Sequence, residues 1–251
     1  MTLQISLHQA STRQAPSIVW TWLGRLQCHA NCDSSKKTPT MEDHKLQVQN
    51  GYDKIAQTYL DWISGRPTAR LNYVEKLLSQ LQSPSEANVL ELGCGAGVPG
   101  TRFLAQRCGH VFANDISQAQ IDLAKTNVPE ENVQFIQGDM TKLKFDRSAL
   151  QAVVAFYSII HLPRDEQRTL IRQIWEWLSP AGYLLCNLGV ADNPGSTADW
   201  LGSRMYWSGF DAETSLGILK DAGFTITQSE VLQDDEDGRL VPFLWILAKK
   251  S

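Results

Sequence analysis

The sequence predicts an α/β fold, in which a mostly parallel sheet carries helices on both faces and ends in a C-terminal antiparallel hairpin. Two observations lead to this prediction. Between residues 88 and 189, apolar runs of strand length alternate with runs of helical periodicity, which is typical of parallel sheets with helical crossovers. At the end of the chain, two apolar runs are joined only by QDDEDGR. That connection is too short for a crossover, so these two strands pair antiparallel.

The expected elements follow in chain order. Residues 47–81 have apolar side chains at three- and four-residue spacing. SGRPT divides them into two helices, because a proline cannot continue the first one. Ser117 is the expected N-cap of the helix after the second strand. Strands are expected at 88–93, 110–116, 133–139, 149–158, 182–189, 224–232 and 240–250, and further helices at 99–108, 117–127, 164–178 and 212–222.

Length and composition limit the classes of function. The chain has 251 residues, of which 43% are hydrophobic, enough for one large domain with a sizeable core. No apolar run is long enough to span a membrane, so no membrane partner is expected. The net charge of -4 comes with scattered Lys and Arg side chains. We therefore expect no nucleic-acid partner.

The first 40 residues differ from the rest. They contain no acidic side chain before Asp33, a composition faintly similar to an organelle transit peptide. A poorly structured extension is the favoured interpretation. The expected organisation is therefore an extension over 1–40 and one domain over 41–251. Within that domain, 47–81 would form a helical cap and 189–211 a lid on the acceptor side.

The cysteine pattern indicates a reducing compartment. The five cysteines are dispersed, which fits reduced thiols in a cytoplasmic protein, although targeting by residues 1–40 stays open. CHANC, residues 28–32, has two cysteines and a histidine. No second ligand pair follows to complete a zinc site, so no metal is expected.

The stretch VLELGCGAGVPG contains two glycine patterns. Gly95, Gly97 and Gly100 match the G-x-G-x-x-G turn of dinucleotide sites, whereas Gly93, Gly95 and Gly97 follow Glu91 in a different pattern. Both kinds of site use glycines so that a ligand can approach the backbone. Both also use an acidic residue at the end of the next strand to accept hydrogen bonds from ribose. The glycines alone leave both ligands open.

Three further features favour a ligand without a pyrophosphate. Glu91 would repel a pyrophosphate but suits an ammonium or sulfonium group. In QGDM, Asp139 could accept a hydrogen bond from an adenine amine, and the Met140 N–H could meet a ring nitrogen. The final hairpin, moreover, is not part of an ordinary dinucleotide fold.

The ordered set VLELGCGAG, NDIS, QGDM, FYSIIHLP and FLWILAKK resembles the class I S-adenosylmethionine-dependent methyltransferases of small molecules. The resemblance covers about residues 52–250. It implies a Rossmann-like, mostly parallel seven-stranded sheet and S-adenosyl-L-methionine as the cofactor. On this interpretation Gly100 completes the dinucleotide pattern by coincidence.

The resemblance also implies cofactor-binding roles at matched positions. Asp115 would hold the ribose hydroxyls, and Phe156 would lie near the methionine amine and the transferring methyl. Glu91 would orient the turn or reach the ligand through water. For Ile116 and Phe156, plain core packing is the alternative. The expected cofactor-binding residues are Glu91, Gly93, Cys94, Gly95, Gly97, Asp115, Ile116, Gly138, Asp139, Met140 and Phe156.

His161 is the candidate catalytic base. It follows the fourth strand, at the carboxyl edge where ligands bind in such sheets, and a histidine can accept a proton near neutral pH. A hydroxyl acceptor would benefit from a base, whereas a neutral amine or an ionised thiol would not need one. The alternative is that His161 caps a turn or contacts the cofactor.

The acceptor is expected to be a small, largely apolar or aromatic molecule. AFYS after the fourth strand differs from the Asn-Pro-Pro loop of methyltransferases that act on adenine or glutamine amides. Together with the negative net charge, this argues against DNA and protein glutamine as acceptors. Aromatic side chains of the cap, the lid and the fourth strand end indicate an apolar pocket. The expected acceptor-binding residues are Tyr52, Tyr59, Trp62, Tyr157, Tyr206 and Trp207.

Two other functions remain to be weighed. An enzyme on this scaffold can be non-methylating, such as a cyclase that uses the cofactor structurally, because fold does not determine function. A dinucleotide oxidoreductase is disfavoured by Glu91 and QGDM. The acceptor atom, whether oxygen, nitrogen or sulfur, and the oligomeric state stay open.

Overall fold

The computed structural model describes residues 40–66 and 68–251. The predictions for the N-terminal extension and for CHANC lie outside these residues. The described helices are α1 (Met41–Ile63), α2 (Arg70–Leu78), α3 (Gly100–Ala105), α4 (Gln118–Asn127), α5 (Arg164–Trp177) and α6 (Ala212–Asp221), with short 3-10 helices at Pro84–Glu86, Met140–Lys142 and Ile159–His161. The strands are β1 (Asn88–Leu92), β2 (His110–Asp115), β3 (Val133–Gln137), β4 (Leu150–Ala155), β5 (Leu178–Gly189), β6 (Asn193–Trp200), β7 (Ser203–Gly209), β8 (Phe224–Glu236) and β9 (Arg239–Lys250).

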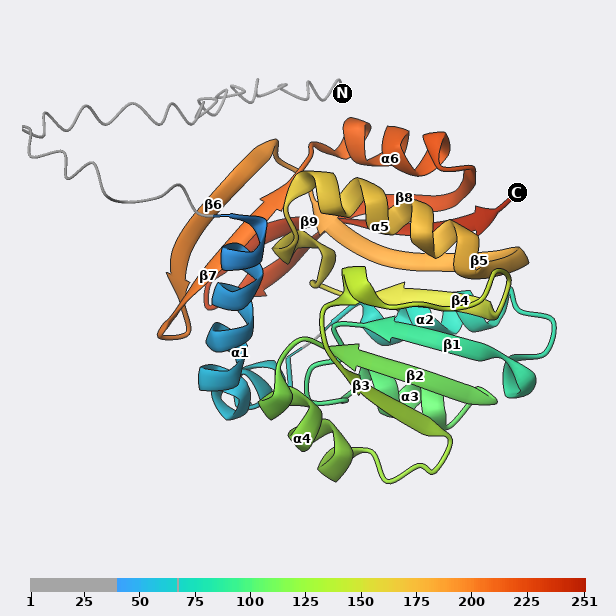
Figure 1. The fold of residues 1–251 in the computed structure, drawn as a ribbon, viewed down its shortest axis with the longest axis horizontal. Helices are drawn as coiled ribbons and strands as arrows, with labels where there is room; N and C mark the ends of the chain where they lie inside the picture. Colours follow the sequence, from blue (N-terminus) through green and yellow to red (C-terminus); the bar gives the residue numbers. More distant parts are fainter. Residues whose placement is uncertain (1–39, 67) are drawn as a thin grey trace, which may run out of the picture. The chain divides into compact units, whose positions relative to one another are not determined.

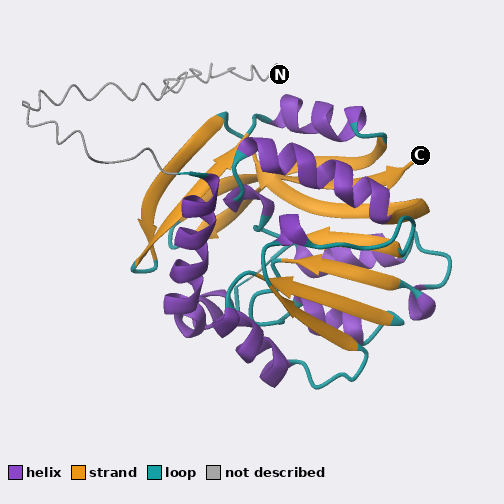
Figure 2. Ribbon diagram, viewed as in Figure 1, coloured by secondary structure: helices purple, strands orange, loops and turns teal. Residues whose placement is uncertain are grey.

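One seven-stranded sheet forms the centre of the domain (Figures 1 and 2), in the order β3-β2-β1-β4-β5-β9-β8. Strands β1 to β5 pair in parallel, and β9 runs antiparallel to both β5 and β8. The predicted fold class is therefore confirmed. Because the strand order reverses between β1 and β4, their carboxyl ends form a switch point, where open α/β sheets bind ligands.

The sheet is covered on both faces. Val89 and Val111 point to one face and pack with side chains of α2 and α3. Leu90 and Leu92, one residue out of phase, point to the other face and pack with α5 and α6. This alternation is the period-two pattern of a strand buried on both sides.

Two hairpins differ from the expected elements: β6–β7 was not expected as strands, and β8–β9 is longer than expected. Residues 189–211, expected as an extended lid, contain the separate two-stranded antiparallel sheet β6–β7. The connection QDDEDGR is largely strand, because β8 and β9 pair as far as Glu236 and Arg239. Asp237 and Gly238, with φ of 57° and 85°, alone make the turn. An Asp-Gly pair with positive φ matches the right-handed twist of the strands it joins.

Helix α1 lies against both β7 and α4 (Figure 1). It begins at Met41, earlier than expected, because Thr40 and Asp43 form a capping box. The carboxylate of Asp53 accepts hydrogen bonds from Ser117 Oγ at 2.6 Å and from the Ala119 N–H at 3.1 Å, which joins α1 to the N-terminus of α4. Ser117 is also the N-cap of α4, as predicted.

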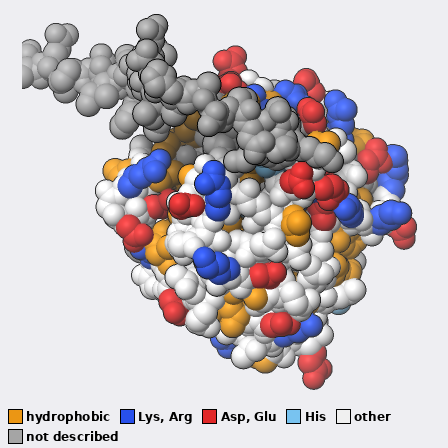
Figure 3. Space-filling model, turned by 60° about the vertical axis from the view of Figure 1, so that its left-hand side comes forward, with side chains coloured by type: hydrophobic (Ala, Val, Ile, Leu, Met, Phe, Trp, Pro, Cys, Tyr) orange, Lys and Arg blue, Asp and Glu red, His pale blue; other side chains and the backbone are white. Residues whose placement is uncertain are grey.

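The described surface has no strong charge asymmetry on the face shown in Figure 3, where Lys and Arg side chains are interspersed with Asp and Glu. That face offers no basic patch to nucleic acid. Among the described helices, none combines the length and the apolar character needed to cross a bilayer.

Candidate functional site

A pocket opens over the glycine turn at the switch point between β1 and β4. We call it the turn pocket. Its walls come from the turn after β1, the ends of β2 and β4, the residues after β3, and α1 and α2. Of the eleven expected cofactor-binding residues, those that line it are Glu91, Gly93, Cys94, Gly95, Asp115, Ile116, Asp139, Met140 and Phe156.

The glycine turn is held close to both neighbouring strands. The N–H groups of Gly93 and Cys94 donate to Asn114 O at 2.8 and 2.9 Å. Gly93 has a φ of 74°, and a Cβ there would lie only 2.3 Å from Ser158 Cβ. A side chain at this position would therefore push away the segment that follows β4.

Two of the expected glycines, Gly97 and Gly138, do not line the turn pocket in the described residues. Gly97 packs against α4 and the residue after it, because a Cβ there would lie 2.6 Å from Val128. The spacing of glycines in a motif does not show whether a glycine makes room for a ligand or for a neighbouring helix.

Asp115 lies at the centre of the pocket and is buried. Its Oδ2 accepts a hydrogen bond from the Gly95 N–H, and its Oδ1 accepts one from the Ser117 N–H, both at 2.9 Å. Burial raises the pKa of Asp115 to about 6, although these N–H groups act against the rise. Each carboxylate oxygen keeps lone pairs for a ligand that donates hydrogen bonds.

Glu91 is the second buried carboxyl group in the pocket. Its Oε2 accepts a hydrogen bond from Thr101 Oγ1 at 2.6 Å, and burial raises its pKa to about 7. A Cβ on Gly100 would lie 2.4 Å from Glu91 Oε1. Gly100 therefore has a structural role unrelated to a dinucleotide, because it leaves room for the Glu91 carboxyl group.

Asp139 is already engaged by the protein. Lys45 of α1 donates to its Oδ2 at 2.6 Å and to Glu166 at 3.0 Å, while Thr141 occupies Oδ1. Burial acts to raise the pKa of Asp139, but Lys45 and Thr141 outweigh it and the pKa lies below its ordinary value. The carboxylate expected to bind adenine thus also holds α1 in place through Lys45. No sequence motif indicates this ion pair.

Two polar side chains that line the turn pocket, Gln120 and Arg70, were not among the expected site residues. Gln120 is 1% exposed, and neither its Nε2 nor its Oε1 has a partner among the described residues. Arg70 lies 4.6 Å from the Tyr157 ring and has only a 3.4 Å hydrogen bond to Tyr59. No carboxylate of the described chain forms an ion pair with it, so its charge is available to a ligand.

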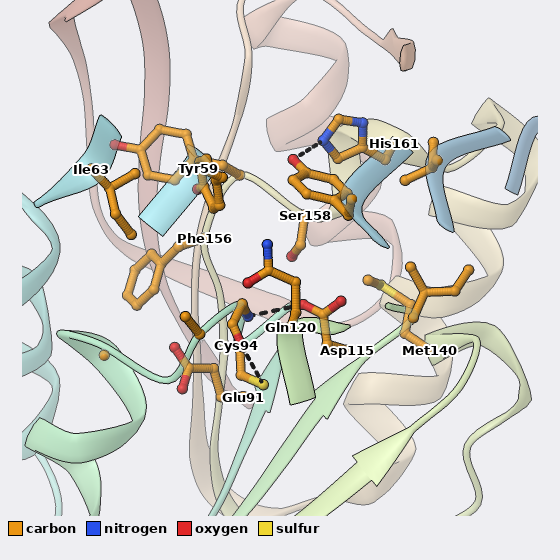
Figure 4. A pocket seen from close by; sticks show the side chains of 18 of the residues that line it. Tyr59, Ile63, Glu91, Cys94, Asp115, Gln120, Met140, Phe156, Ser158 and His161 are labelled. Carbon is orange, nitrogen blue, oxygen red and sulfur yellow. Dashed lines mark hydrogen bonds between the residues drawn. The ribbon is translucent and has the colours of Figure 1, made fainter. Parts of the chain in front are cut away.

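His161 is buried and hydrogen-bonded at both ring nitrogens. Nδ1 lies 2.7 Å from Tyr206 O and Nε2 lies 2.9 Å from Tyr52 Oη. Burial lowers the pKa of His161 to about 4, so the ring is neutral at physiological pH. A carbonyl only accepts, so Nδ1 carries the proton and Nε2 accepts from the Tyr52 hydroxyl. Nε2 of the expected base is therefore occupied by the Tyr52 hydroxyl, and this hydrogen bond is the dashed line at His161 in Figure 4.

A second cavity, of about 880 Å³, adjoins the turn pocket. We call it the aromatic cavity. Trp62, Trp200 and Tyr59 form its aromatic corner, with ring centroids 5.5 to 6.2 Å apart. The two spaces share the lining residues Tyr52, Tyr59, Ile63, Arg70, Val98, Tyr157 and His161, so a molecule in one reaches the boundary of the other.

Five of the six aromatic residues expected at the acceptor site line this cavity, and Tyr206 does not. Tyr206 is 4% exposed and stacks on His44 at 4.1 Å. Tyr206 and Trp207 are neighbours in β7, and consecutive strand residues point to opposite faces. For this reason the two side chains do not both line the aromatic cavity, although both were expected at the acceptor site. Trp200 of β6 lines the aromatic cavity, where Tyr206 does not.

Comparison with known proteins supports this geometry. Residues 89–182 match the family model of a methyltransferase domain. A malonyl-acyl-carrier protein O-methyltransferase of Halalkalibacterium halodurans is 32% identical over 152 residues, which is 56% of this chain and 54% of that protein. The chain spans about half the length of the curated relatives it matches.

Solved structures share the fold. The 1,6-didemethyltoxoflavin-N1-methyltransferase of Burkholderia thailandensis, solved with 1,6-didemethyltoxoflavin and S-adenosylhomocysteine, has a TM-score of 0.66 at 19% identity and covers 86% of this chain and 92% of its own. The cyclase SpnF has a TM-score of 0.63 at 18% identity, covering 82% and 96%.

The strand order, the glycine turn with Asp115 and the matched domain model agree with one another. Residues 89–182 match a methyltransferase domain, and the fold is the one shared by the S-adenosylmethionine-dependent methyltransferases of known structure.

Proposed function

We propose that the chain transfers the methyl group of S-adenosylmethionine to a small, largely apolar or aromatic acceptor bound in the aromatic cavity. The observation that carries this proposal is the shared wall between the two spaces. A cofactor over the glycine turn and an acceptor among the tryptophans would meet at Tyr52, Arg70 and His161. A cytoplasmic location, the absence of nucleic-acid and membrane partners, and the residue assignments below stay predictions.

The turn pocket suits the chemistry of the cofactor. Asp115 offers acceptor lone pairs to ribose hydroxyls, and Glu91 offers an anion to the ammonium or sulfonium group. Arg70 has no ion-pair partner in the described residues, so its guanidinium is free to bind the methionine carboxylate. Ile116 and Met140 line the side of the pocket near Asp139, where adenine would lie. When bound, the cofactor supplies a methyl group activated by the positive sulfur.

The aromatic cavity accounts for the acceptor class. Most of the acceleration in such a transfer comes from holding the acceptor in line with the methyl group and excluding water. Rigid aromatic walls do both for a flat or apolar molecule. Tyr52, Tyr59, Trp62, Tyr157 and Trp207 are the proposed acceptor-binding residues, with Trp200 added.

The proton path for a hydroxyl acceptor runs through Tyr52. Its hydroxyl donates to His161 Nε2, and burial raises the pKa of Tyr52 well above its ordinary value, so the phenol is not itself a free base. With the cofactor bound, its S–C bond would break as the acceptor oxygen takes the methyl group, and the electron pair would stay on sulfur. The acceptor proton would pass to the Tyr52 oxygen while the Tyr52 proton passes to His161 Nε2. An amine or thiol acceptor would make this path dispensable.

A non-methylating cyclase is the second candidate. The fold likeness to the cyclase SpnF and the size of the aromatic cavity are the observations in its favour. The two candidates differ in the fate of the methyl group. A cyclase rearranges its substrate without consuming the cofactor, whereas a methyltransferase releases one S-adenosylhomocysteine for each product.

An acceptor screen with methyl-labelled S-adenosylmethionine tests the proposal. Planar phenols, aromatic amines and thiols would be offered separately, and both labelled product and S-adenosylhomocysteine would be quantified. We expect stoichiometric formation of the two with at least one acceptor class. Conversion of a polyunsaturated substrate without cofactor turnover would instead support the cyclase.

A further inference from the structure

The side chain of Gln120 is the least satisfied polar group in the turn pocket. It is the third residue of α4, and its backbone N–H donates to the N-cap Ser117 Oγ at 3.1 Å. Its side chain points into the turn pocket (Figure 4). It is 1% exposed, yet both amide atoms lack a partner throughout residues 40–66 and 68–251.

Such an arrangement is costly for the protein alone. A buried amide with neither its donor nor its acceptor satisfied destabilises the fold. A straight apolar side chain such as Met would fill the same space without that cost. The presence of an unsatisfied amide here therefore points to a ligand that completes its hydrogen bonds.

The neighbours of the amide identify the part of the ligand. A Cβ on Gly95 would lie 3.8 Å from Gln120 Oε1 and 3.8 Å from Tyr59 Cε1. Gln120 Oε1 and the Tyr59 ring of α1 therefore both lie beside the glycine turn. Asp115, two residues before the Ser117 N-cap, is hydrogen-bonded to the same Gly95. A group held by Asp115 would lie within reach of the Gln120 amide.

The two side chains have complementary hydrogen-bonding capacity. The Asp115 carboxylate only accepts, so it takes the protons of hydroxyl groups and leaves their oxygen lone pairs unpaired. The Gln120 Nε2 donates two protons, which suits those lone pairs, and its Oε1 can accept from a further hydroxyl or from an ammonium. Among the polar groups of the cofactor, the carboxylate has no hydrogen-bond donor and the ammonium has no acceptor. The ribose diol has both, so it matches Asp115 and Gln120 together.

We propose that Gln120 binds the ribose diol of the cofactor together with Asp115, with Nε2 donating to a hydroxyl oxygen whose proton goes to the carboxylate. This inference rests on the proposed function only in taking S-adenosylmethionine as the ligand. It makes Gln120 a positioning residue that keeps the ribose, and so the attached sulfur, at a fixed place over the glycine turn.

The test compares Gln120→Met with the wild type by calorimetry and thermal melting. The matched control is Gln118→Met, on the exposed side of the same helix. We expect Gln120→Met to weaken S-adenosylhomocysteine binding by about 10-fold and to raise the melting temperature of the ligand-free protein by about 2–4 °C. The control should change neither by a comparable amount. Opposite signs for binding and stability are not expected of a merely structural residue.

A second probe separates the ribose from the amino-acid part. 5′-Methylthioadenosine keeps the adenine and ribose but lacks the amino acid. Gln120→Met should weaken its binding by the same factor as that of S-adenosylhomocysteine. A loss confined to S-adenosylhomocysteine would assign Gln120 to the amino-acid end and overturn the proposal, as would unchanged affinity for both or a lower melting temperature without ligand.

Gln120→Glu provides a second variant that keeps size and acceptor but removes the donor. It should weaken both ligands at least as much as Gln120→Met, and wild-type affinity in this variant would contradict the proposal. Failure of the proposed function gives a different result. If the wild-type protein binds neither ligand, S-adenosylmethionine is excluded as its cofactor. Binding by the wild type with no effect at Gln120 would remove only this inference.

Discussion

The turn pocket and the aromatic cavity share a wall but are built in different ways. The floor of the turn pocket is formed by short connections at the carboxyl ends of adjacent parallel strands, so Glu91, Gly95 and Asp115 come together through local geometry. Helices α1 and α2 complete its walls. The aromatic cavity is assembled from α1, the β6–β7 hairpin and the end of β8, which are far apart in the sequence. A local motif can therefore indicate the cofactor, whereas the proposed acceptor site depends on tertiary packing.

This contrast predicts that substitutions will separate into effects on turnover, on the cofactor and on the acceptor. The largest effect is expected at the shared wall. For a hydroxyl acceptor, His161→Ala should lower turnover by about 10²–10⁴-fold, with affinity for S-adenosylhomocysteine unchanged. Tyr52→Phe, which removes only the hydroxyl that donates to Nε2, should cause a loss of similar order. Turnover is measured with saturating cofactor.

The pH profile sharpens this test. Because burial holds the pKa of His161 at about 4, turnover should show no inflection near the ordinary histidine value of about 6.5. Near-normal turnover of a hydroxyl acceptor by both variants would show that the pair is structural. A much smaller loss with an amine or thiol would be consistent with the proposed path.

The next largest effect is expected in the turn pocket. Asp115→Ala removes the carboxylate proposed to hold the ribose and should weaken cofactor binding by about 1.5–3 kcal/mol, or roughly 10- to 150-fold. The control is Asp122→Ala, which removes an exposed carboxylate of α4. Unchanged calorimetric affinity in folded Asp115→Ala would exclude Asp115 from the site.

Cofactor affinity should also depend on pH. The pKa of ligand-free Asp115 is about 6 and that of Glu91 about 7, both raised first by burial. A ligand that donates hydrogen bonds to Asp115 and brings a cation to Glu91 stabilises their ionised forms and lowers both pKa values. Affinity should therefore be full above about pH 8 and fall below pH 7, by about tenfold per pH unit for each group that must ionise. Affinity that is flat from pH 8 to 5 would contradict these contacts.

The smallest effect is expected in the aromatic cavity. Trp200 is in ring contact with Tyr59 and Trp62 at 5.5 Å each, and aromatic pairs contribute modestly beyond their buried area. Trp200→Ala should raise the KM for the acceptor by about 3- to 10-fold and leave cofactor affinity unchanged. A loss of cofactor affinity instead would show that the two spaces are not separable.

The sequence predicted the sheet and most of the turn pocket because both depend on short-range patterns. Alternating periodicity indicated the strands, and the glycine spacing with Asp115 indicated the ligand edge. The Asp237–Gly238 turn was also readable, since Asp-Gly is a strong hairpin signal. It was missed because the acidic run around it resembles a loop.

The remaining site residues have no local signal. Lys45, Arg70 and Gln120 lie on helices whose spacing shows only an apolar face, and their burial follows from how α1, α2 and α4 pack over the sheet edge. Tyr206 shows the same limit. Only the knowledge that 203–209 is a strand reveals that Tyr206 and Trp207 point to opposite faces. Sequence patterns define elements, but the direction of a side chain depends on the element's partners.

The central claim is that the turn pocket holds S-adenosylmethionine rather than a dinucleotide. Calorimetric titration of the wild-type protein with S-adenosylhomocysteine and, separately, with NADH tests it most directly. We predict saturable one-to-one binding of S-adenosylhomocysteine and no appreciable binding of NADH. Saturable binding of NADH, with none of S-adenosylhomocysteine, would contradict the account.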